Sequence, residues 1–405
     1  MTDRLYYRDS LLDSFSATVV DFVPGDRPAV VLDRTAFYPS SGGQLFDTGT
    51  LIVADTEVRV CEVAETSDGR ILHFLDEAPP PRGVVVRGQI NMERRLDHMQ
   101  QHSGQHVLTA AFIRLYGLET VSFHMGNESC SIDLQTNGLT AEQIAGAEAL
   151  ANQIVFKDLA VEIRFVTREE AEGLGVRKIP AVEHQRLRLI DIHTVDLTAC
   201  GGTHVTRTGQ IGAILLRKAE KVRQGWRVEF VCGKRAVRAA RRDFSTLTEC
   251  AGLVSGPVWE VPQQVRKLQE SVKTLRRTNA QIQEELASFH AQQLLAEAAE
   301  DSGRKLVTRI FADRDLDYIK LLAQRAVRQG TAICLFAATA GTPALVFAQT
   351  AGLPYDMGAL MKQVLGELGG RGGGSKDMAQ GGPERIESLE QALNQLGSQV
   401  RGRRS

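Results

Sequence analysis

The stretch Met92–Tyr116 reads MERRLDHMQQHSGQHVLTAAFIRLY and is followed by Gly117. The pattern becomes helical at Asn91, and it predicts one long helix that a glycine ends. Residues 120–250 then mix β-prone runs with helical segments, which is typical of an α+β domain. The expected elements there are strands at Cys130–Leu134, Val161–Val166, Leu187–Ile192, Ala213–Lys218 and Trp226–Cys232, and helices at Ala141–Val155 and Lys234–Cys250.

The chain before this helix, residues 1–90, has the pattern of a small β-domain. Short β-prone runs alternate with turns rich in Gly, Pro and Asp. The runs are Ala17–Val23, Ala29–Leu32, Thr50–Ala54, Val58–Val63, Ile71–Leu75 and Val84–Ile90. Short strands at this spacing predict a small barrel or an open sheet.

A heptad pattern follows at residues 261–289. Its nine seam positions are alternately four and three residues apart, and they are Val261, Val265, Leu268, Val272, Leu275, Asn279, Ile282, Leu286 and Phe289. As a helix this seam would be about 40 Å long, and its eight apolar positions require a partner. The partner is either a second copy of the chain, which the strict 3.5-residue period favours, or a following helix through Leu294–Ala298. Asn279 either specifies the register of that partner or is a tolerated polar residue near the end of a helical hairpin.

The rest of the chain alternates strands and helices over residues 305–368. A glycine-rich loop is expected at 369–374 and a last helix at Pro383–Gln399. The chain is therefore predicted to be an α+β multidomain protein. Its parts would be a β-barrel-like domain (1–90), an α+β domain (91–252), a coiled-coil or helical linker (258–300) and an α/β domain (301–405).

Composition excludes several classes of protein. The chain has 405 residues, of which 43% are hydrophobic and 24% charged, so it is not a disordered polymer. The net charge is −1, so contact with nucleic acid would need a local basic patch. No apolar run is long enough for a membrane span, and the first residues lack the apolar core of a signal peptide. Six cysteines in so long a chain are free thiols or metal ligands rather than a disulfide framework, and we expect a cytoplasmic protein.

Two short motifs hold metal-ligand chemistry. In the predicted helix, His102 and His106 are four residues apart, so both imidazoles lie on one face. In the second motif, Cys200-Gly-Gly-Thr-His204, two glycines allow a tight turn that brings thiolate and imidazole together. Three histidines and one cysteine are a tetrahedral ligand set for Zn²⁺, and we expect one zinc per chain. A metalloprotease is excluded because Ser103 stands where the H-E-x-x-H motif needs its glutamate.

A third motif lies at residues 35–49, TAFYPSSGGQLFDTG, and is rich in glycine and hydroxyl residues. Backbone amides in such a segment can approach a ligand closely. The alternative is an ordinary hairpin loop, and the residues by themselves favour the hairpin loop over a ligand-binding segment.

Taken together, the motifs resemble a known family. Their order along the chain is Phe37-Tyr38-Pro39, Ser41-Gly42-Gly43-Gln44, Arg94-Arg95, His102 and His106, Val121–Gly126, then Cys200–His204. This set is similar to the editing domain of alanyl-tRNA synthetases, and more so to the free-standing trans-editing proteins of the AlaX type. The segment Gly369–Gly374 with Lys376–Gly382 resembles the DHH-associated C-terminal domain found behind such editing modules. The resemblance covers nearly the whole chain.

The resemblance implies a zinc-containing editing domain at 91–252 and a DHH-associated tRNA-binding domain at 301–405. It implies hydrolysis of the ester between serine or glycine and alanine-specific tRNA. Such editing is needed because an alanine pocket rejects serine poorly and cannot exclude the smaller glycine. Thr35 matches a threonine placed to bond the serine hydroxyl, although a β-strand threonine facing solvent fits the residue equally well. Gln44 and His124 are candidate polar wall residues, and His124 could equally be a structural histidine.

The family pattern is incomplete in two respects. The chain begins at the editing region, so we expect it not to charge tRNA. Asp97-His98-Met99 is not a D-H-H metal motif, so phosphodiester cleavage is not expected.

Four protein ligands would close the zinc tetrahedron, whereas catalytic zinc usually keeps an open position. Zinc either activates water through a loosened or five-coordinate site, or it only positions the substrate, and we favour the second role.

A tRNA substrate requires basic surface. Residues 205–242 hold eleven Lys and Arg against two acids, an excess too large for an ordinary solvated helix face. The predicted tRNA-binding residues are Arg217, Lys218, Lys221, Arg223 and Arg227, with Arg371 and Lys376 at the glycine-rich segment. That segment lacks P-loop spacing, so RNA is favoured over a nucleotide. Alternatives to a deacylase are a tRNA-binding zinc protein without turnover and the editing half of a split synthetase.

Overall fold

The structure is a computed structural model that describes residues 2–54, 56–177, 179 and 186–402. The chain divides into two compact units, residues 1–249 and residues 250–405. The finer division at residues 90, 252 and 300 stays a prediction. None of the helices in the described part of the chain combines the length and apolar character that crossing a bilayer requires.

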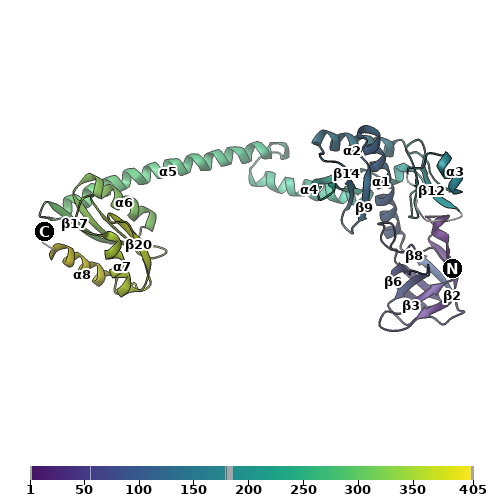
Figure 1. Cartoon of the computed structure of the whole chain (residues 1–405), viewed down its shortest axis with the longest axis horizontal. Helices are drawn as coiled ribbons and strands as arrows, with labels where there is room; N and C mark the ends of the chain where they lie inside the picture. The colour runs from purple at the N-terminus through teal and green to yellow at the C-terminus, as the bar shows by residue number, and fades with distance from the viewer. Residues whose placement is uncertain (1, 55, 178, 180–185, 403–405) are drawn as a thin grey trace. The chain divides into compact units, whose positions relative to one another are not determined.

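Unit 1 begins with a closed six-stranded β-barrel (Figure 1). Its strands, in barrel order, are β2 (Ser14–Val23), β3 (Ala29–Leu32), β7 (Ile71–Leu75), β6 (Thr56–Glu65), β5 (Gly49–Val53) and β8 (Val85–Ile90). Alternate side chains such as Phe15, Ala17 and Val19 fill the interior, as the period of two requires. The barrel alternative of the sequence prediction is therefore confirmed. Two short strands, β1 (Asp3–Arg4) and β4 (Arg34–Thr35), pair beside it.

Helix α1 (Met92–Tyr116) follows the barrel and has the predicted bounds. The Asn91 side chain caps its first turn by accepting from the backbone N–H of Arg94. Gly117 ends it in the left-handed conformation, at φ 66°. From His98 to Phe112 every residue of α1 is buried, so the helix lies inside unit 1.

Two sheets and several helices surround α1. One sheet has the order β14 (Ile214–Val222), β15 (Gly225–Cys232), β10 (Cys130–Leu134), β9 (Thr120–Met125). The other has the order β11 (Val161–Val166), β12 (Leu187–Ile192), β13 (Asp196–Ala199). The helices are η1 (Leu5–Tyr7), α2 (Ala141–Phe156), α3 (Arg168–Gly173), η2 (Thr208–Ile211) and α4 (Gly233–Leu253). Leu108 and Phe112 of α1, Ile132 of β10 and Ile154 of α2 belong to one apolar core.

Unit 2 contains a six-stranded sheet between two layers of helices (Figure 1). The strand order is β16 (Glu300–Asp301), β17 (Arg304–Phe311), β18 (Ala332–Ala338), β19 (Ala344–Gln349), β21 (Met378–Pro383), β20 (Gly370–Gly374). The helices are η3 (Val258–Glu260), α5 (Val261–Glu297), α6 (Leu316–Gln329), α7 (Met357–Leu368) and α8 (Leu389–Gly402). Helix α6 and the last turns of α5 pack on one face of the sheet, while α7 and α8 pack on the other. Strands covered on both faces explain the continuous apolar run of β18.

Three sequence predictions in unit 2 are wrong. The glycine-rich segment is not a loop, because Gly370–Gly374 forms β20 and pairs with β21. The last helix begins at Leu389 rather than at Pro383, which is the final residue of β21. Residues 294–297 are the last turn of α5 itself, so no following helix there can cover the heptad seam. In the described chain the heptad seam is exposed. The exposed fraction of its apolar side chains from Val265 onward ranges from 40% at Leu286 to 70% at Phe289.

Candidate metal centre

Four potential metal ligands meet inside unit 1. His102 and His106 are one turn apart on α1, while Cys200 and His204 flank the loop that follows β13. One donor atom from each residue lies within 4.8 Å of the donors of all the others. The three imidazoles are buried and Cys200 is half-buried. The four residues that the two sequence motifs singled out are therefore neighbours in space.

The donor atoms converge in a way that suits a tetrahedral ion. The Sγ of Cys200 lies 3.4 Å from Nε2 of His102 and 3.3 Å from Nε2 of His204. A tetrahedron with Zn–N of about 2.0 Å and Zn–S of about 2.3 Å has edges of about 3.5 Å between nitrogen and sulfur. Imidazole nitrogen with thiolate sulfur is also the donor set that zinc prefers, so the residues fit this metal.

Each imidazole is held through its other nitrogen. The Nδ1 atom of His106 lies 3.0 Å from Oδ2 of Asp196, and Nδ1 of His102 lies 2.8 Å from Oε1 of Gln44. Both oxygens only accept hydrogen bonds, so Nδ1 carries a proton and Nε2 is the nitrogen that faces the other residues of the centre. The Nδ1 atom of His204 lies 3.1 Å from the Ser103 hydroxyl. Partners of this kind orient metal-binding histidines.

Electrostatics favour the deprotonated form that a metal requires at Cys200 and His204, but not at His106. Burial raises the pKa of the Cys200 thiol, but the attraction and hydrogen bonds of the neighbouring imidazoles, His102 above all, hold that pKa well below its usual value. Burial lowers the pKa of His204 to about 3, so this imidazole is neutral. For His106, burial is outweighed by hydrogen bonds with Asp196 and Cys200, which raise its pKa to about 9. A bound metal would displace that proton.

The carboxylate behind His106 is itself fixed. Arg177 donates to both oxygens of Asp196, at 2.8 Å and 3.1 Å, which leaves the carboxylate little freedom to turn. Burial raises the pKa of Asp196, yet the bonds from His106 and Arg177 lower it to about 2. Sequence reasoning missed both residues. The available signal was the position of Asp196 four residues before the cysteine motif.

Gln44 joins the two motifs. Its Oε1 also accepts from the backbone N–H of Thr203, at 3.1 Å, and its Nε2 donates to the Thr203 hydroxyl at 2.8 Å. Gly202 makes this close packing possible, because a Cβ there would lie 2.2 Å from the His102 ring and 2.8 Å from Oε1 of Gln44. The predicted wall residue Gln44 therefore lies at the centre of the site.

The segment that carries Gln44 is anchored to α1. Arg95 and Asp47 form an ion pair with no exposed surface, and Arg95 also donates to the backbone carbonyls of Ser10 and Ala36. The Ser10 hydroxyl in turn accepts from the backbone N–H of His204, at 3.3 Å. The barrel, α1 and the cysteine loop thus hold the four ligands together.

Thr35 is the last residue of β4, the short strand beside the barrel, and has no exposed surface. Its hydroxyl accepts from the backbone N–H of Phe37 at 3.1 Å and lies 2.8 Å from Nε2 of His73. The described hydrogen bonds of Thr35 thus connect it to the barrel interior and not to the four ligands. Its predicted contact with a serine hydroxyl stays a prediction.

His124 lies on the protein surface, away from the four potential metal ligands. Its side chain is exposed and faces Asp133 of the neighbouring strand at 3.9 Å. The preceding residue, Phe123, stacks on the His102 ring with centroids 5.5 Å apart. Successive residues of a strand point to opposite faces, so Phe123 rather than His124 faces the four residues of the centre, and the role of His124 as a wall residue stays a prediction.

The predicted basic residues of unit 1 gather on the β14–β15 hairpin. Several are neutralised, since Arg217 pairs with Asp243, Lys218 with Glu220 and Arg227 with Asp133. Lys221 and Arg223 are exposed near the hairpin turn.

A cleft of about 710 Å³ lies between this hairpin and α4. Five of its lining residues are basic and two are acidic: Arg217, Lys218, Arg235, Arg238, Arg242, Glu128 and Glu229. Arg238 and Arg242 are exposed and form no ion pair with the described residues. In unit 2, Arg371 on β20 and Lys376 in the turn before β21 are both exposed.

Family models match three parts of the chain. Residues 10–94 match the model described as tRNA synthetases class II (A). Residues 187–228, which include the cysteine motif, match the threonyl and alanyl tRNA synthetase second additional domain. Residues 291–402 match the DHHA1 domain.

Known proteins match this chain over nearly all of its length. The alanyl-tRNA editing protein AlaX-L of Pyrococcus horikoshii is 31% identical over 99% of this chain and 100% of its own length. The chain therefore belongs to the family of alanyl-tRNA editing proteins. The alanine–tRNA ligase of Natronomonas pharaonis is 32% identical over 97% of this chain. The matched region is 43% of the length of the ligase. Among solved structures, the C-Ala domain from Aquifex aeolicus alanyl-tRNA synthetase matches 26% of this chain and 99% of its own at 19% identity, with a TM-score of 0.25, too low for a structural argument.

Proposed function

We propose that the chain is an aminoacyl-tRNA deacylase that removes serine or glycine from wrongly charged alanine tRNA. Membership of the alanyl-tRNA editing family supports the class of substrate. The observation that carries the chemistry is the convergence of three imidazole nitrogens and one thiolate on a single point inside unit 1.

His102, His106, Cys200 and His204 would hold one zinc ion. When bound, the ion supplies positive charge that polarises the ester carbonyl. Because four protein ligands already complete a tetrahedron, we propose a positioning and electrostatic role for the metal, with the attacking water held by other groups.

The chain's own residues keep this centre preorganised. Asp196 and Gln44 hold the Nδ1 protons of His106 and His102, so neither ring can turn away. Phe123 covers one face of the His102 ring and excludes water from it. Selectivity then requires a group that bonds the serine hydroxyl, because a site built around such a bond rejects a substrate that lacks it. Gln44 and Thr35 are the proposed groups.

We propose that tRNA phosphates bind the β14–β15 hairpin and the adjoining cleft, with Arg371 and Lys376 as a second contact. The net positive charge of the cleft lining and the absence of ion pairs at Arg238 and Arg242 among the described residues support the first contact. Each phosphate contact adds about −0.7 to −0.9 to the slope of log affinity against log salt, which a titration measures.

A deacylation assay tests the function. Alanine tRNA charged with serine, glycine or alanine is incubated with the chain, with and without chelator, beside the variants Cys200→Ala and Cys61→Ala. Cys61 is an exposed thiol of the barrel strand β6 and serves as the matched control. We expect serine and glycine release by the wild type and the control, and loss of both with chelator or Cys200→Ala.

Two results would contradict this function. Tight tRNA binding without any release would make the chain a binding protein. Release only after a separate aminoacylating chain is added, with co-purification of the two, would make it the editing half of a split synthetase.

A further inference from the structure

The outer edge of the unit 2 sheet is open along most of β17. Strand β16 pairs only with Arg304 and Lys305, through a two-residue turn at Ser302 and Gly303 in which both residues have positive φ. Beyond Lys305, β17 pairs with β18 on one side, and no described strand pairs with its other side.

The backbone groups along this open edge alternate in direction. The N–H of Lys305 donates toward β18, to the carbonyl of Thr331, and the carbonyl of Phe311 accepts from Thr339 on the same side. Odd-numbered residues therefore face β18, and the N–H and C=O groups of Leu306, Thr308 and Ile310 point outward. None of the three N–H groups has a hydrogen-bond partner in the described part of the chain.

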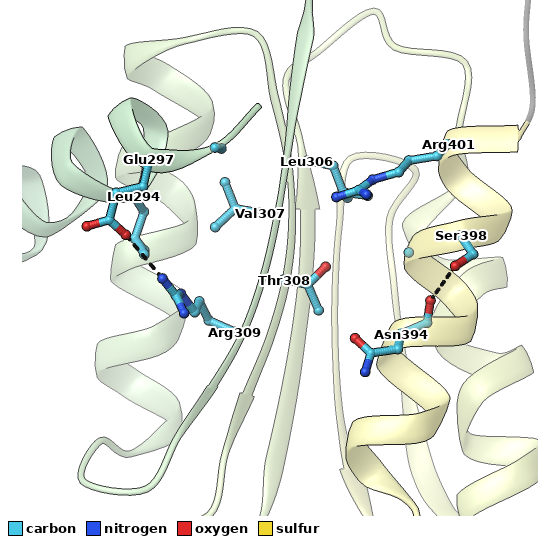
Figure 2. A pocket seen from close by; sticks show the side chains of 11 residues that line it. Leu294, Glu297, Leu306, Val307, Thr308, Arg309, Asn394, Ser398 and Arg401 are labelled. Atoms are coloured by element: carbon cyan, nitrogen blue, oxygen red, sulfur yellow. Dashed lines mark hydrogen bonds and ion pairs between the residues drawn. The ribbon is translucent and has the colours of Figure 1, made fainter. Parts of the chain in front are cut away.

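The open edge lies at the bottom of a groove (Figure 2). The groove has a volume of about 460 Å³, and residues 306–309 of β17 line it. Leu294, Glu297 and Ala298, at the end of α5, form one wall. Asn394, Gly397, Ser398 and Arg401 of α8 form the other. Figure 2 shows Thr308 between these walls.

We propose that this groove binds an extended acidic segment of a partner protein, which pairs with β17 as an added strand. A protein that adds a strand to a sheet edge gains main-chain hydrogen bonds, and side-chain pockets select the sequence. Five residues from Leu306 to Ile310 span about 16 Å, enough for three outward-facing backbone sites. An open edge without such a partner is an aggregation hazard, which folded proteins generally cover or shorten.

The shape of the groove selects a single strand rather than a second copy of this chain. An identical β17 would itself lie between its own α5 and α8, and two recessed edges cannot approach to the separation of about 4.8 Å that paired strands need. A lone extended segment has no such walls.

Charge selects an acidic segment. Arg309 of β17 and Glu297 of the α5 wall form an ion pair at 3.1 Å and neutralise each other. Arg401 is exposed at the mouth and forms no ion pair with the described residues, so the lining carries a net charge of +1. A carboxylate on the added strand would pair with Arg401.

The test selects displayed random heptapeptides on the full-length chain and measures the enriched peptide by fluorescence anisotropy. We expect acidic, β-prone sequences without proline. Thr308→Pro should weaken their binding at least tenfold, because it removes an outward N–H without touching the bonds to β18. Thr308→Val keeps that N–H at nearly the same volume and should bind as the wild type does. Arg401→Glu should weaken acidic peptides and spare neutral ones.

Hydrogen exchange of the wild-type chain supplies a second readout. Bound peptide should slow exchange of the amides of Leu306, Thr308 and Ile310. Absence of enrichment, or equal affinity for Thr308→Pro and Thr308→Val, overturns the proposal. Protection of these three amides by unfractionated tRNA but not by any enriched peptide would also overturn it, and would assign the groove to RNA.

Discussion

Helices α1 and α5 depart from the usual pattern of burial in opposite directions. Helix α1 buries eight polar residues between its second and fifth turns: His98, Gln100, Gln101, His102, Ser103, Gln105, His106 and Thr109. Helix α5 exposes a row of large apolar residues: Val265, Leu268, Val272, Leu275, Ile282, Leu286 and Phe289. In water, buried polar groups and exposed apolar rows are both unfavourable unless something else satisfies them.

For α1 the chain itself provides the partners. Gln101 exchanges two hydrogen bonds with the backbone of Cys232, and Gln100 donates to the carbonyl of Gln210. For α5 the described chain provides none along the seam. This buried polar network therefore commits most of its atoms to named neighbours, with Nδ1 of His98 as an exception among the described residues, whereas an exposed seam leaves the partner to be found by experiment.

Breaking the seam should have the largest effect. We propose that α5 pairs with α5 of a second copy, and Leu268→Glu with Leu275→Glu should then convert the dimer entirely to monomer. The control is Gln263→Glu with Thr274→Glu, which adds the same charge at exposed positions outside the seam. Light scattering measures the mass, and a wild type that is monomeric at high micromolar concentration would contradict the dimer.

Acid should destabilise unit 1 first. His73 is completely buried in the barrel, and burial lowers its pKa to about 4, against about 6.5 when unfolded. Because the folded-state pKa is the lower one, stability is complete above pH 6.5 and falls as the pH drops toward 4. A shift of this size corresponds to about 3 kcal/mol. Unit 2 has one histidine, His290, which is partly exposed.

Tryptophan fluorescence can isolate this effect. Trp226 lies in unit 1 and Trp259 in unit 2, so Trp259→Phe leaves a single reporter of unit 1. Denaturant unfolding at pH 7 and pH 5 should show a smaller acid-induced loss of free energy when His73→Phe is added. An unchanged loss would exclude His73 as its source.

Asp196→Asn should weaken zinc binding by about 10–100-fold, because it removes the negative charge and leaves one acceptor oxygen for both His106 and Arg177. Asp191→Asn is the control, since Asp191 pairs with Arg164 on the same small sheet but touches no ligand. Competition with a metal-binding dye gives both affinities. Equal affinities would show that Asp196 does not support the centre.

Thr35→Val should have the smallest effect. Loss of the hydroxyl removes a buried hydrogen-bond partner and costs about 1–3 kcal/mol. If Thr35 contacts serine, release of serine falls more than release of glycine, and Thr35→Ser restores it. An equal fall for both substrates would give Thr35 a structural role through His73.

Local patterns were sufficient to predict much of the fold. Met92–Tyr116, Ile71–Leu75 and Cys130–Leu134 have the predicted bounds, because caps and turn residues mark where each ends. Strand β20 was missed because its glycines have no side-chain periodicity, and only pairing with β21 makes them a strand. The exact start of α8 depends on that same pairing.

The centre could be predicted only in part. Spacing within each motif singled out the four residues that meet in space and could hold a metal, since i,i+4 histidines and a Cys-Gly-Gly-Thr-His turn are local features. Of the residues that hold the rings, Gln44 was predicted only as a wall residue, and Asp196 and Ser103 were not predicted, because the three reach the imidazoles from separate segments. His124 was selected as a polar residue type, and Phe123 was not considered, whereas strand orientation decides which of the two faces the site.

X-ray absorption at the zinc edge of the purified full-length chain tests the central claim most directly. The account predicts one zinc per chain with three nitrogen neighbours at about 2.0–2.1 Å and one sulfur neighbour at about 2.3 Å. A spectrum without a sulfur neighbour, or with two or more, would contradict a centre built from His102, His106, Cys200 and His204.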